Sequence, residues 1–368
     1  MRSKLNIVVV GLSLSSSWGN GHATTYRALL KALAARGHNI LFLEQDRDFY
    51  AAHRDLANPD FCRLELYDEV GDLARYRHEI ASADAVIVGS YVANGVEAGR
   101  IVQKHAEGVT AFYDIDTPVT LANLARGACD YLSPELVPGY DIYFSFTGGP
   151  TLDLLEREWG APRAQALYCS VDPQLYHPAP AERVYDLGYL GTYSDDRQPV
   201  LEQLLIEPAR RAPQLRFVVA GPQYPASIVW PENVTRIEHV GPEDHPAFYA
   251  SCRYTLNVTR ADMVAAGYSP SVRLFEAAAC GTPIISDHWE GLDTLFQPGE
   301  EIVIARSSDG VLARLLDTDD SERNDMSVAA RTHVLENHTA MHRAIEFETA
   351  IRAAQRTARR NLKKPATV

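Results

Sequence analysis

The chain has 368 residues, of which 46% are hydrophobic and 23% are charged, and its formal net charge is −13. This length exceeds one ordinary core and suits two domains, and the composition is that of a globular protein rather than a disordered one. The negative charge argues against nucleic acid and anionic membranes as partners, because both repel an acidic protein that lacks a local basic patch.

The first half of the chain alternates short apolar runs with helical segments. The run 5–10 follows Arg2 and Lys4, as in a short signal peptide, but it leads into a Gly/Ser-rich loop and an amphipathic segment, which favours a buried parallel strand. Further strands are expected at 39–44, 85–89, 110–113 and 142–146, and helices at 24–35, 96–104 and 151–159. Repeated β-α-β units predict a parallel sheet with helices on both faces.

A proline-containing connector, 167–180, separates this half from the next. Three prolines fall within eight residues there, which makes the segment stiff and extended. Beyond it, strands are expected at 187–190, 216–220, 236–240, 254–258 and 283–286, with helices at 199–209 and 339–361. The second half therefore predicts a second parallel α/β domain.

These elements predict an α/β fold of two doubly wound, Rossmann-like domains that face each other across a cleft. We expect the domains at 1–178 and 179–338, followed by a C-terminal helix and basic tail at 339–368. Ligands of doubly wound sheets lie beyond the carboxyl ends of the strands. Each motif below lies at such an end.

The compartment is indicated by the cysteines and by the apolar segments. The five cysteines are odd in number and no two are close in sequence, so neither a disulfide framework nor zinc spacing is present, and a reducing compartment is favoured. No apolar segment approaches the roughly 20 residues that span a bilayer. We therefore expect a cytoplasmic protein with no membrane span and no metal site.

The strongest motif is the segment 267–286. Ser269 and Pro270 are suited to the N-cap and first position of a helix, which is expected to run to Cys280 and stop at Gly281. A helix N-terminus presents free N–H groups and the positive end of the helix dipole, which suit a diphosphate. Ser271 stands among these first residues.

Two charged residues follow on one face of that helix. Arg273 can bind phosphate oxygens through two hydrogen bonds, and Glu276, three residues on, can accept hydrogen bonds from ribose hydroxyls. This spacing fits a sugar nucleotide. An ordinary surface ion pair between the two side chains is the alternative, and the spacing alone does not decide between them.

The run Ser-Val-Arg-Leu-Phe-Glu-Ala-Ala-Ala-Cys-Gly-Thr-Pro-Ile-Ile-Ser at 271–286, with 289–296 and 299–301 after it, resembles the donor-binding signature of GT-B glycosyltransferases (group 1 type). The resemblance is closest to the spore-maturation-protein (CgeB-like) group and covers about 185–340. It implies a nucleotide-sugar donor bound by the second domain, Glu276 on the ribose, Arg273 near the phosphates, and an acceptor on the first domain. A larger retaining family carries a second Glu where this chain has Tyr268, which leaves retention or inversion open.

Further donor-side residues end neighbouring strands. Gly191 lets a ligand approach the backbone, and Arg197 stands just before the next helix, where the resemblance implies a basic residue for the diphosphate. An exposed Arg at a helix start is the alternative. Gly221, Asn257 and Arg260 also follow strand ends, and each is open to interpretation as a turn residue.

The loop 11–22 joins the first strand to the first helix and contains Gly19, Gly21 and His22. It is not a dinucleotide-binding motif, because Gly-x-Gly-x-x-Gly is absent and only Glu44 is placed to serve as its acidic residue. The resemblance implies that this loop faces the acceptor and carries a histidine base, and a neutral His22 is suited to that role near pH 7. A helix cap or a phosphate ligand is the alternative.

Asp114 and Asp116 follow another strand in the sequence Tyr-Asp-Ile-Asp-Thr-Pro. The Asp-x-Asp pattern is typical of the metal site of the other glycosyltransferase fold, but in an acceptor-type domain we interpret it as an acceptor-site carboxylate. Asp116 is preferred, because Thr-Pro after it holds the turn. An N-cap aspartate is the alternative.

The predicted function is metal-independent transfer of a sugar from a nucleotide-diphosphate donor, with UDP favoured, to an unidentified hydroxyl acceptor. The donor is a co-substrate, and no permanently bound cofactor is expected. A sugar-nucleotide epimerase of the same architecture and a non-catalytic nucleotide-sugar binding protein are the alternatives. A DNA-base glucosyltransferase is disfavoured by the acidic balance, which the C-terminal basic cluster does not offset. That cluster comprises Arg356, Arg359, Arg360, Lys363 and Lys364.

Overall fold

The computed structural model describes residues 3–19 and 21–362, with side chains described as far as residue 357. The chain forms two compact units. Unit 1 comprises Met1–Tyr168 with Ala340–Val368, and unit 2 comprises Cys169–Thr339. The first division therefore falls after Tyr168 rather than at 178, and the C-terminal helix belongs to unit 1.

Contacts at the two points where the chain passes from one unit to the other, after Tyr168 and after Thr339, explain this division. Cys169 donates from its thiol to the carbonyl oxygen of Pro270 at 3.4 Å, and Val171 forms a β-bridge with Thr339, so the connector is built into unit 2. Of the C-terminal basic cluster only the exposed Arg356 has a described side chain, and the other four residues lie outside the residues whose side chains are described.

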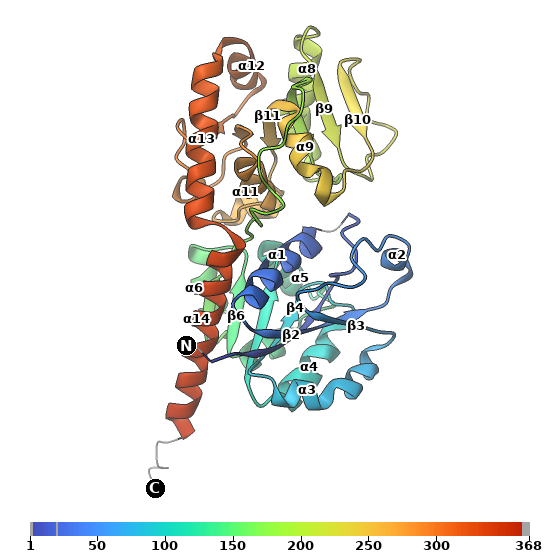
Figure 1. Cartoon of the computed structure of the whole chain (residues 1–368), viewed down its shortest axis with the longest axis vertical. Helices are drawn as coiled ribbons and strands as arrows, with labels where there is room; N and C mark the ends of the chain where they lie inside the picture. The colour runs from blue at the N-terminus through green and yellow to red at the C-terminus, as the bar shows by residue number, and fades with distance from the viewer. Residues whose placement is uncertain (1–2, 20, 363–368) are drawn as a thin grey trace. The chain divides into compact units, whose positions relative to one another are not determined.

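Unit 1 is built on a seven-stranded sheet of order β3-β2-β1-β4-β5-β6-β7, in which every neighbouring pair is parallel (Figure 1). Its strands are β1 Asn6–Gly11, β2 Asn39–Gln45, β3 Arg63–Tyr67, β4 Ala85–Gly89, β5 Val109–Asp114, β6 Ile142–Ser145 and β7 Ala164–Ala166. Its helices are α1 Gly21–Ala35, α2 Asp48–Ala51, η1 Val70–Tyr76, α3 Arg77–Ser82, α4 Gly95–His105, α5 Thr117–Ala125, η2 Pro134–Gly139, α6 Pro150–Arg157 and α14 Ala340–Leu362.

Helices cover both faces of the unit 1 sheet, as its apolar strands require. On one face Val86 and Val88 of β4 join a core with Ile80 of α3 and Val102 of α4. On the other face α1 and α14 lie side by side (Figure 1), and Phe347 of α14 stacks on Phe144 of β6 with ring centroids 5.4 Å apart.

Unit 2 repeats this plan with a six-stranded parallel sheet of order β10-β9-β8-β11-β12-β13. Its strands are β8 Tyr185–Leu190, β9 Phe217–Ala220, β10 Val234–Ile237, β11 Cys252–Asn257, β12 Ile284–Ser286 and β13 Val303–Ile304. Its helices are α7 Gln198–Leu201, η3 Glu202–Ile206 (a π-helical turn), α8 Glu207–Arg211, η4 Pro242–Asp244, α9 His245–Ala250, α10 Ala261–Ala266, α11 Val272–Ala279, η5 Leu292–Thr294, α12 Ser308–Asp317 and α13 Asp320–Asn337.

Both strand orders confirm the predicted doubly wound architecture. In each sheet the chain first moves outward from a central strand and then crosses to that strand's other side, so the order reverses between β1 and β4 in unit 1 and between β8 and β11 in unit 2. Ligands of doubly wound sheets bind beyond the carboxyl ends of the strands at such a switch point. Within the described residues, no helix combines the length and apolar character needed to cross a membrane.

One predicted helix start is wrong by two residues. Ser271, rather than Ser269, is the N-cap of α11, and the left-handed backbone at Gly267 (φ 66°) and Tyr268 (φ 46°) delays the helix. The hydroxyl of Ser271 donates to Asn257 Oδ1 at 2.7 Å and makes no cap hydrogen bond to the helix. The predicted end at Cys280, followed by Gly281 in the left-handed region, is confirmed.

A buried carboxylate attaches α14 to the rest of unit 1. Glu348 is 1% exposed, accepts from Arg36 Nε at 2.9 Å and from Arg352 Nε at 2.7 Å, and lies 3.5 Å from His38 Nε2. Burial alone would raise the pKa of Glu348, but the two guanidinium groups outweigh it and hold this pKa at about 2. The carboxylate is therefore ionised in the folded state at every ordinary pH.

Replacing this carboxylate should destabilise unit 1 in a pH-dependent way. The folded pKa of Glu348 lies below its ordinary value of 4.5, so the stabilisation is complete above pH 4.5 and is lost as pH falls toward 2. We expect Glu348→Gln to lower the free energy of unfolding at pH 7 by about 2 kcal/mol, less than a fully buried pair because both arginines are partly exposed. Calorimetric unfolding at pH 7 and pH 3 measures both the loss and its decline.

Glu135→Gln is the control, because Glu135 pairs with Arg100 in the same unit and both side chains are more than half exposed. It should change the melting temperature little at either pH. Equal losses for the two variants would contradict the assignment of Glu348.

Candidate functional site

The switch point of unit 2 is formed by the carboxyl ends of β8, β9 and β11. Gly191 follows β8 and Gly221 follows β9, and the two backbones touch: an ideal Cβ on Gly221 would lie 2.1 Å from the Gly191 carbonyl oxygen. Gly221 also has φ +144°, which glycine tolerates and other residues rarely adopt. Gly221 is therefore required by the close approach of the strand ends, and Gly191 by the side chains of Tyr189 and Arg273, which fill the space where its Cβ would lie.

Arg273 lies across this switch point in the first turn of α11. Its Nε donates to the Leu190 carbonyl oxygen at 2.5 Å, its Nη1 donates to Asn257 Oδ1 at 2.9 Å, and its guanidinium lies 4.9 Å from the ring centre of Tyr189. Its Nη2 occupies the space beside Gly191, 2.9 Å from where a Cβ would be. The side chain is 8% exposed, so the alternative of a surface ion pair is wrong.

The partners of Arg273 are all neutral. Among the described residues no carboxylate lies within 4.0 Å of its guanidinium, and its Nη2 has no hydrogen-bond partner. The charge of Asp287 acts on Arg273 without direct contact. A buried cation with no carboxylate in contact is costly, so this position favours an anion beside Gly191. The backbone N–H groups of Val272 and Arg273 at the start of α11 also have no acceptor in the described part of the chain, which adds donors at the same place.

Asn257 organises the polar side of this switch point. Its Oδ1 accepts from Ser271 and Arg273, and its Nδ2 donates to Ser286 Oγ at 2.9 Å. Asp287 accepts from the backbone N–H and the hydroxyl of Thr259, each at 2.8 Å. Burial raises the pKa of Asp287 although Thr259, Ser286 and Arg273 oppose that rise. The strand ends and the helix start are thus joined by one buried network.

Glu276 belongs to a second cluster on the side of α11 that packs against α9. Its Oε2 accepts from the Tyr249 hydroxyl at 3.2 Å and lies 3.5 Å from His245 Nδ1, and the Tyr176 hydroxyl lies 3.4 Å from the same nitrogen. Burial raises the pKa of Glu276, but hydrogen bonds from His245, Tyr176 and Tyr249 outweigh it and hold this pKa below its usual value. Glu276 is therefore a buried carboxylate whose contacts with Tyr249 and His245 are made by Oε2.

The other two predicted donor-side arginines are placed differently. Arg197 is half-buried at the N-cap of α7 and donates to the Thr192 carbonyl oxygen at 2.8 Å, while its buried Nε has no partner among the described residues. The alternative of an exposed Arg is therefore wrong. Arg260 lies 3.6 Å from Asp196 Oδ2 and just before α10, so its charge is already paired.

Three residues that the sequence did not single out support the end of β9. The guanidinium of Arg236 lies over the rings of Tyr224 and Trp230, at 4.1 and 4.9 Å from their centres, and donates to the carbonyl oxygens of Val219 and Gly221. Tyr224 donates to the Gly191 carbonyl oxygen at 3.1 Å. These contacts are set by tertiary packing.

In unit 1, Glu44 fixes the loop between β1 and α1. This fully buried carboxylate accepts from the backbone of Leu14 at 2.6 Å and of Ser15 at 2.9 Å, and from the Ser15 hydroxyl at 2.6 Å. Its oxygens are thereby directed into the protein's own loop. Glu44 has a structural role here, in line with the absence of a dinucleotide motif.

The same loop leads to His22 at the switch point of unit 1. Gly19 is exposed with φ +57°. Helix α1 begins at Gly21, three residues earlier than predicted, so His22 lies in its first turn. His22 meets the ring of Tyr91 edge-on, with centroids 5.2 Å apart. Burial lowers the pKa of His22, and nearby Asp116 opposes this only in part. The imidazole is therefore neutral at pH 7.

Asp114 and Asp116 have separate environments after β5. Asp114 is fully buried and accepts from Tyr143 at 2.5 Å and from Thr120 at 2.8 Å, and burial raises its pKa to about 6. Asp116 is half-buried at the N-cap of α5, makes no cap hydrogen bond, and accepts from the Tyr91 hydroxyl at 3.2 Å. Asp116 is thus the carboxylate beside His22.

Each unit therefore brings several of its predicted residues together at its own switch point. Unit 2 brings together Gly191, Gly221, Asn257, Ser271 and Arg273, whereas Glu276 contacts a different cluster. Unit 1 brings together His22 and Asp116. The sequence analysis missed Tyr91 and His245. His245 stands before a proline at a helix start, and no pattern in one sequence places it against Glu276.

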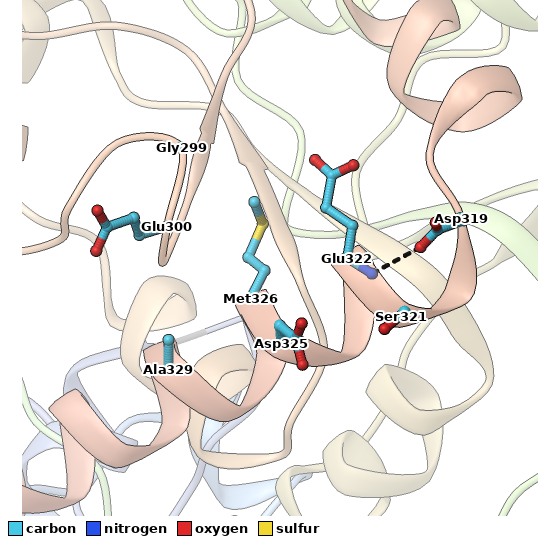
Figure 2. A pocket seen from close by; sticks show the side chains of 8 residues that line it. All are labelled: Gly299, Glu300, Asp319, Ser321, Glu322, Asp325, Met326 and Ala329. Carbon is cyan, nitrogen blue, oxygen red and sulfur yellow. Dashed lines mark hydrogen bonds between the residues drawn. The ribbon is translucent and has the colours of Figure 1, made fainter.

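A hollow of about 450 Å³ in unit 2 lies apart from these residues (Figure 2). It is lined by Gly299, Glu300, Asp319, Ser321, Glu322, Asp325, Met326 and Ala329. Asp319 caps α13 by accepting from the Glu322 backbone at 2.7 Å. The acidic lining of the hollow disfavours the binding of a diphosphate. In the described part of the chain no three His, Cys, Asp or Glu side chains are arranged to hold a metal ion.

Comparison with known proteins supports this architecture. Residues 197–349 match a family model described as glycosyl transferase-like. The comparison with curated proteins finds no match. Among solved structures, the sucrose-phosphate synthase of Thermosynechococcus elongatus matches with a TM-score of 0.68 at 14% identity, covering 95% of this chain and 99% of that one.

Two further structures carry ligands. The Anabaena protein HepE in complex with UDP and glucose matches with a TM-score of 0.71 at 12% identity, covering 95% of this chain and all of that one. An alpha-glucosyltransferase in complex with UDP-glucose and DNA matches with the same TM-score, identity and coverage. At these identities the likeness shows the fold, and the chain therefore has the GT-B fold, with a second unit that matches a glycosyl transferase-like family model.

Proposed function

We propose that this protein transfers a sugar from a nucleotide-diphosphate donor to a hydroxyl acceptor. The observation that carries the proposal is the buried guanidinium of Arg273, which has only neutral partners beside Gly191 and the N-terminus of α11. A diphosphate supplies the missing negative charge. The family match over residues 197–349 supports the same reaction class.

The donor diphosphate would be held by Arg273 and the free N–H groups of Val272 and Arg273, with Arg197 as a second cation at the end of β8. These fixed positive groups would stabilise the negative charge that develops on the departing diphosphate, which accounts for transfer without a metal ion. Glu276 would accept from the donor ribose through Oε1, because Tyr249 and His245 contact Oε2.

UDP is the favoured nucleotide, by analogy with two proteins of the same fold. HepE and the alpha-glucosyltransferase, which share the fold, were solved with UDP or UDP-glucose. We also infer that the chain belongs nearest the CgeB-like group, on the residues of 271–286, and that it is cytoplasmic. The acceptor would bind to unit 1 beside Gly19, Gly21 and His22, where the neutral imidazole would take the acceptor proton and Asp116 would stabilise the resulting cation.

Nucleotide binding should depend on Arg273. Loss of its charge-assisted hydrogen bonds in Arg273→Ala should weaken UDP binding by about 10- to 100-fold, and Glu276→Gln by about 10-fold. His22→Gln and Asp116→Asn should leave binding within about twofold, because they lie in unit 1 and the proposed donor site is built from unit 2. Calorimetric titration with UDP, in EDTA and in magnesium, measures each constant and tests metal independence.

Arg323→Ala is the matched control, since Arg323 is 4% exposed in the same unit and pairs with Asp320 on α13. It should leave UDP affinity unchanged. Normal binding in Arg273→Ala, or lost binding in His22→Gln, would overturn the assignment of the two units. UDP binding without any sugar release from UDP-glucose would favour the non-catalytic alternative, and sugar isomerisation without release would favour the epimerase.

The turnover number kcat should fall only at acidic pH. The pKa of His22 lies below its ordinary value of 6.5, and a base acts in its neutral form, so kcat should be constant above pH 6.5 and fall as pH passes down through the lowered pKa. UDP release from saturating UDP-glucose, with water as acceptor, measures this between pH 5 and 8.

His22→Gln should lower kcat by about 100-fold and remove the acidic limb, because no imidazole remains to be protonated. An acidic limb centred above pH 6.5, or one that persists in His22→Gln, would show that another group is the base.

A further inference from the structure

Tyr91 has a backbone conformation that its residue type disfavours. It follows β4 with φ +61°, in the left-handed region where a bulky side chain is rare. Such strain persists only where surrounding contacts impose it, and it is concentrated at functional sites. Asn94, three residues on, also has a positive φ of 53°, but it is the N-cap of α4 and Asn tolerates this region.

The main chain around Tyr91 is held to β5. The buried Ser90 donates its backbone N–H to the Tyr113 carbonyl oxygen at 3.0 Å, and its Oγ accepts from the Ile115 backbone at 3.0 Å. The loops after β4 and β5 are therefore joined just before Asp116. Since β4 flanks β1 at the switch point, Tyr91 lies where ligands of doubly wound sheets bind.

The side chain of Tyr91 contacts residues from three other segments. Its hydroxyl donates to Asp116 Oδ2 at 3.2 Å, and its ring meets His22 edge-on at 5.2 Å between centroids. On the other side the ring packs against Tyr131, with centroids 4.7 Å apart. Tyr131 is hydrogen-bonded to Thr120 at 2.8 Å, and Thr120 donates to Asp114 at 2.8 Å.

We propose that Tyr91 is a positioning residue, whose hydroxyl sets the orientation of Asp116 and whose ring sets that of His22. This rests on the proposed function, because it assigns a role in that reaction to these two residues. The left-handed backbone directs the Tyr91 side chain back across the carboxyl ends of β1 and β5, and the Tyr131 ring supports it there. Asp116 makes no helix-cap bond, and its Oδ2 accepts from this hydroxyl.

Tyr91→Phe tests the proposal, because it removes the hydroxyl and keeps the ring against His22 and Tyr131. With UDP-glucose as the probe, we expect kcat for UDP release to fall by about 10-fold or more, while KM for the donor and the melting temperature stay close to wild type. Asn94→Gly is the matched control: it relieves the neighbouring left-handed residue without touching Asp116 or His22, and should leave kcat unchanged. Unchanged kcat in Tyr91→Phe would overturn the proposal.

A second readout does not require turnover. The ring nitrogen NMR signals of His22, assigned by their loss in His22→Gln, should shift in Tyr91→Phe, because this variant no longer holds Asp116, whose charge acts on His22. They should stay in place in Asn94→Gly. An unmoved His22 signal in Tyr91→Phe would overturn the proposal, even if kcat fell. If wild-type protein released no UDP while the His22 signal shifted, the proposed function would fail and the positioning role would stand.

Discussion

The arrangement of both units depends on parallel strands that end at one edge of each sheet. In unit 2 this edge brings the carbonyl oxygen of Leu190 and the side chain of Asn257 within reach of one guanidinium, that of Arg273. The guanidinium is buried against neutral acceptors and the face of Tyr189, and no described carboxylate is in direct contact with it. The glycines at the ends of β8 and β9, the start of α11 and the proposed diphosphate all follow from that geometry.

Buried carboxylates are used for several purposes in this fold. Glu44 accepts hydrogen bonds from backbone N–H groups of the loop after β1. Glu348 of α14 accepts from Arg36, which attaches the helix, and from Arg352 of the same helix. Asp114 is protected by Tyr143 and Thr120, and its burial raises its pKa. Asp116 differs because it is half-buried, lies beside a neutral histidine and accepts a hydrogen bond from the Tyr91 hydroxyl. These differences are the reason that Asp116, and not Asp114, is the carboxylate of the proposed acceptor site.

The parts of the fold that sequence predicted well are those set by local pattern. The strand Ala85–Gly89 was predicted at its observed bounds, and the end of α11 at Gly281 follows from a glycine in the left-handed region. The start of α11 was not predictable, since Ser269 and Ser271 are equally good caps in isolation. Only the pairing of Ser271 with Asn257, 14 residues away, and the left-handed Tyr268 distinguish them.

By itself, the sequence determined two doubly wound domains, because apolar periodicity and glycine placement are local properties. Its resemblance to GT-B glycosyltransferases drew attention to Arg273 and Glu276 and to the histidine in the loop after the first strand. Tertiary structure decided the rest. It separated Arg273 from Glu276 by giving them different partners, assigned the connector to unit 2 and α14 to unit 1, and placed Tyr91 against His22 and Asp116. These outcomes depend on which strand ends become neighbours, and that order is set by packing of the whole sheet.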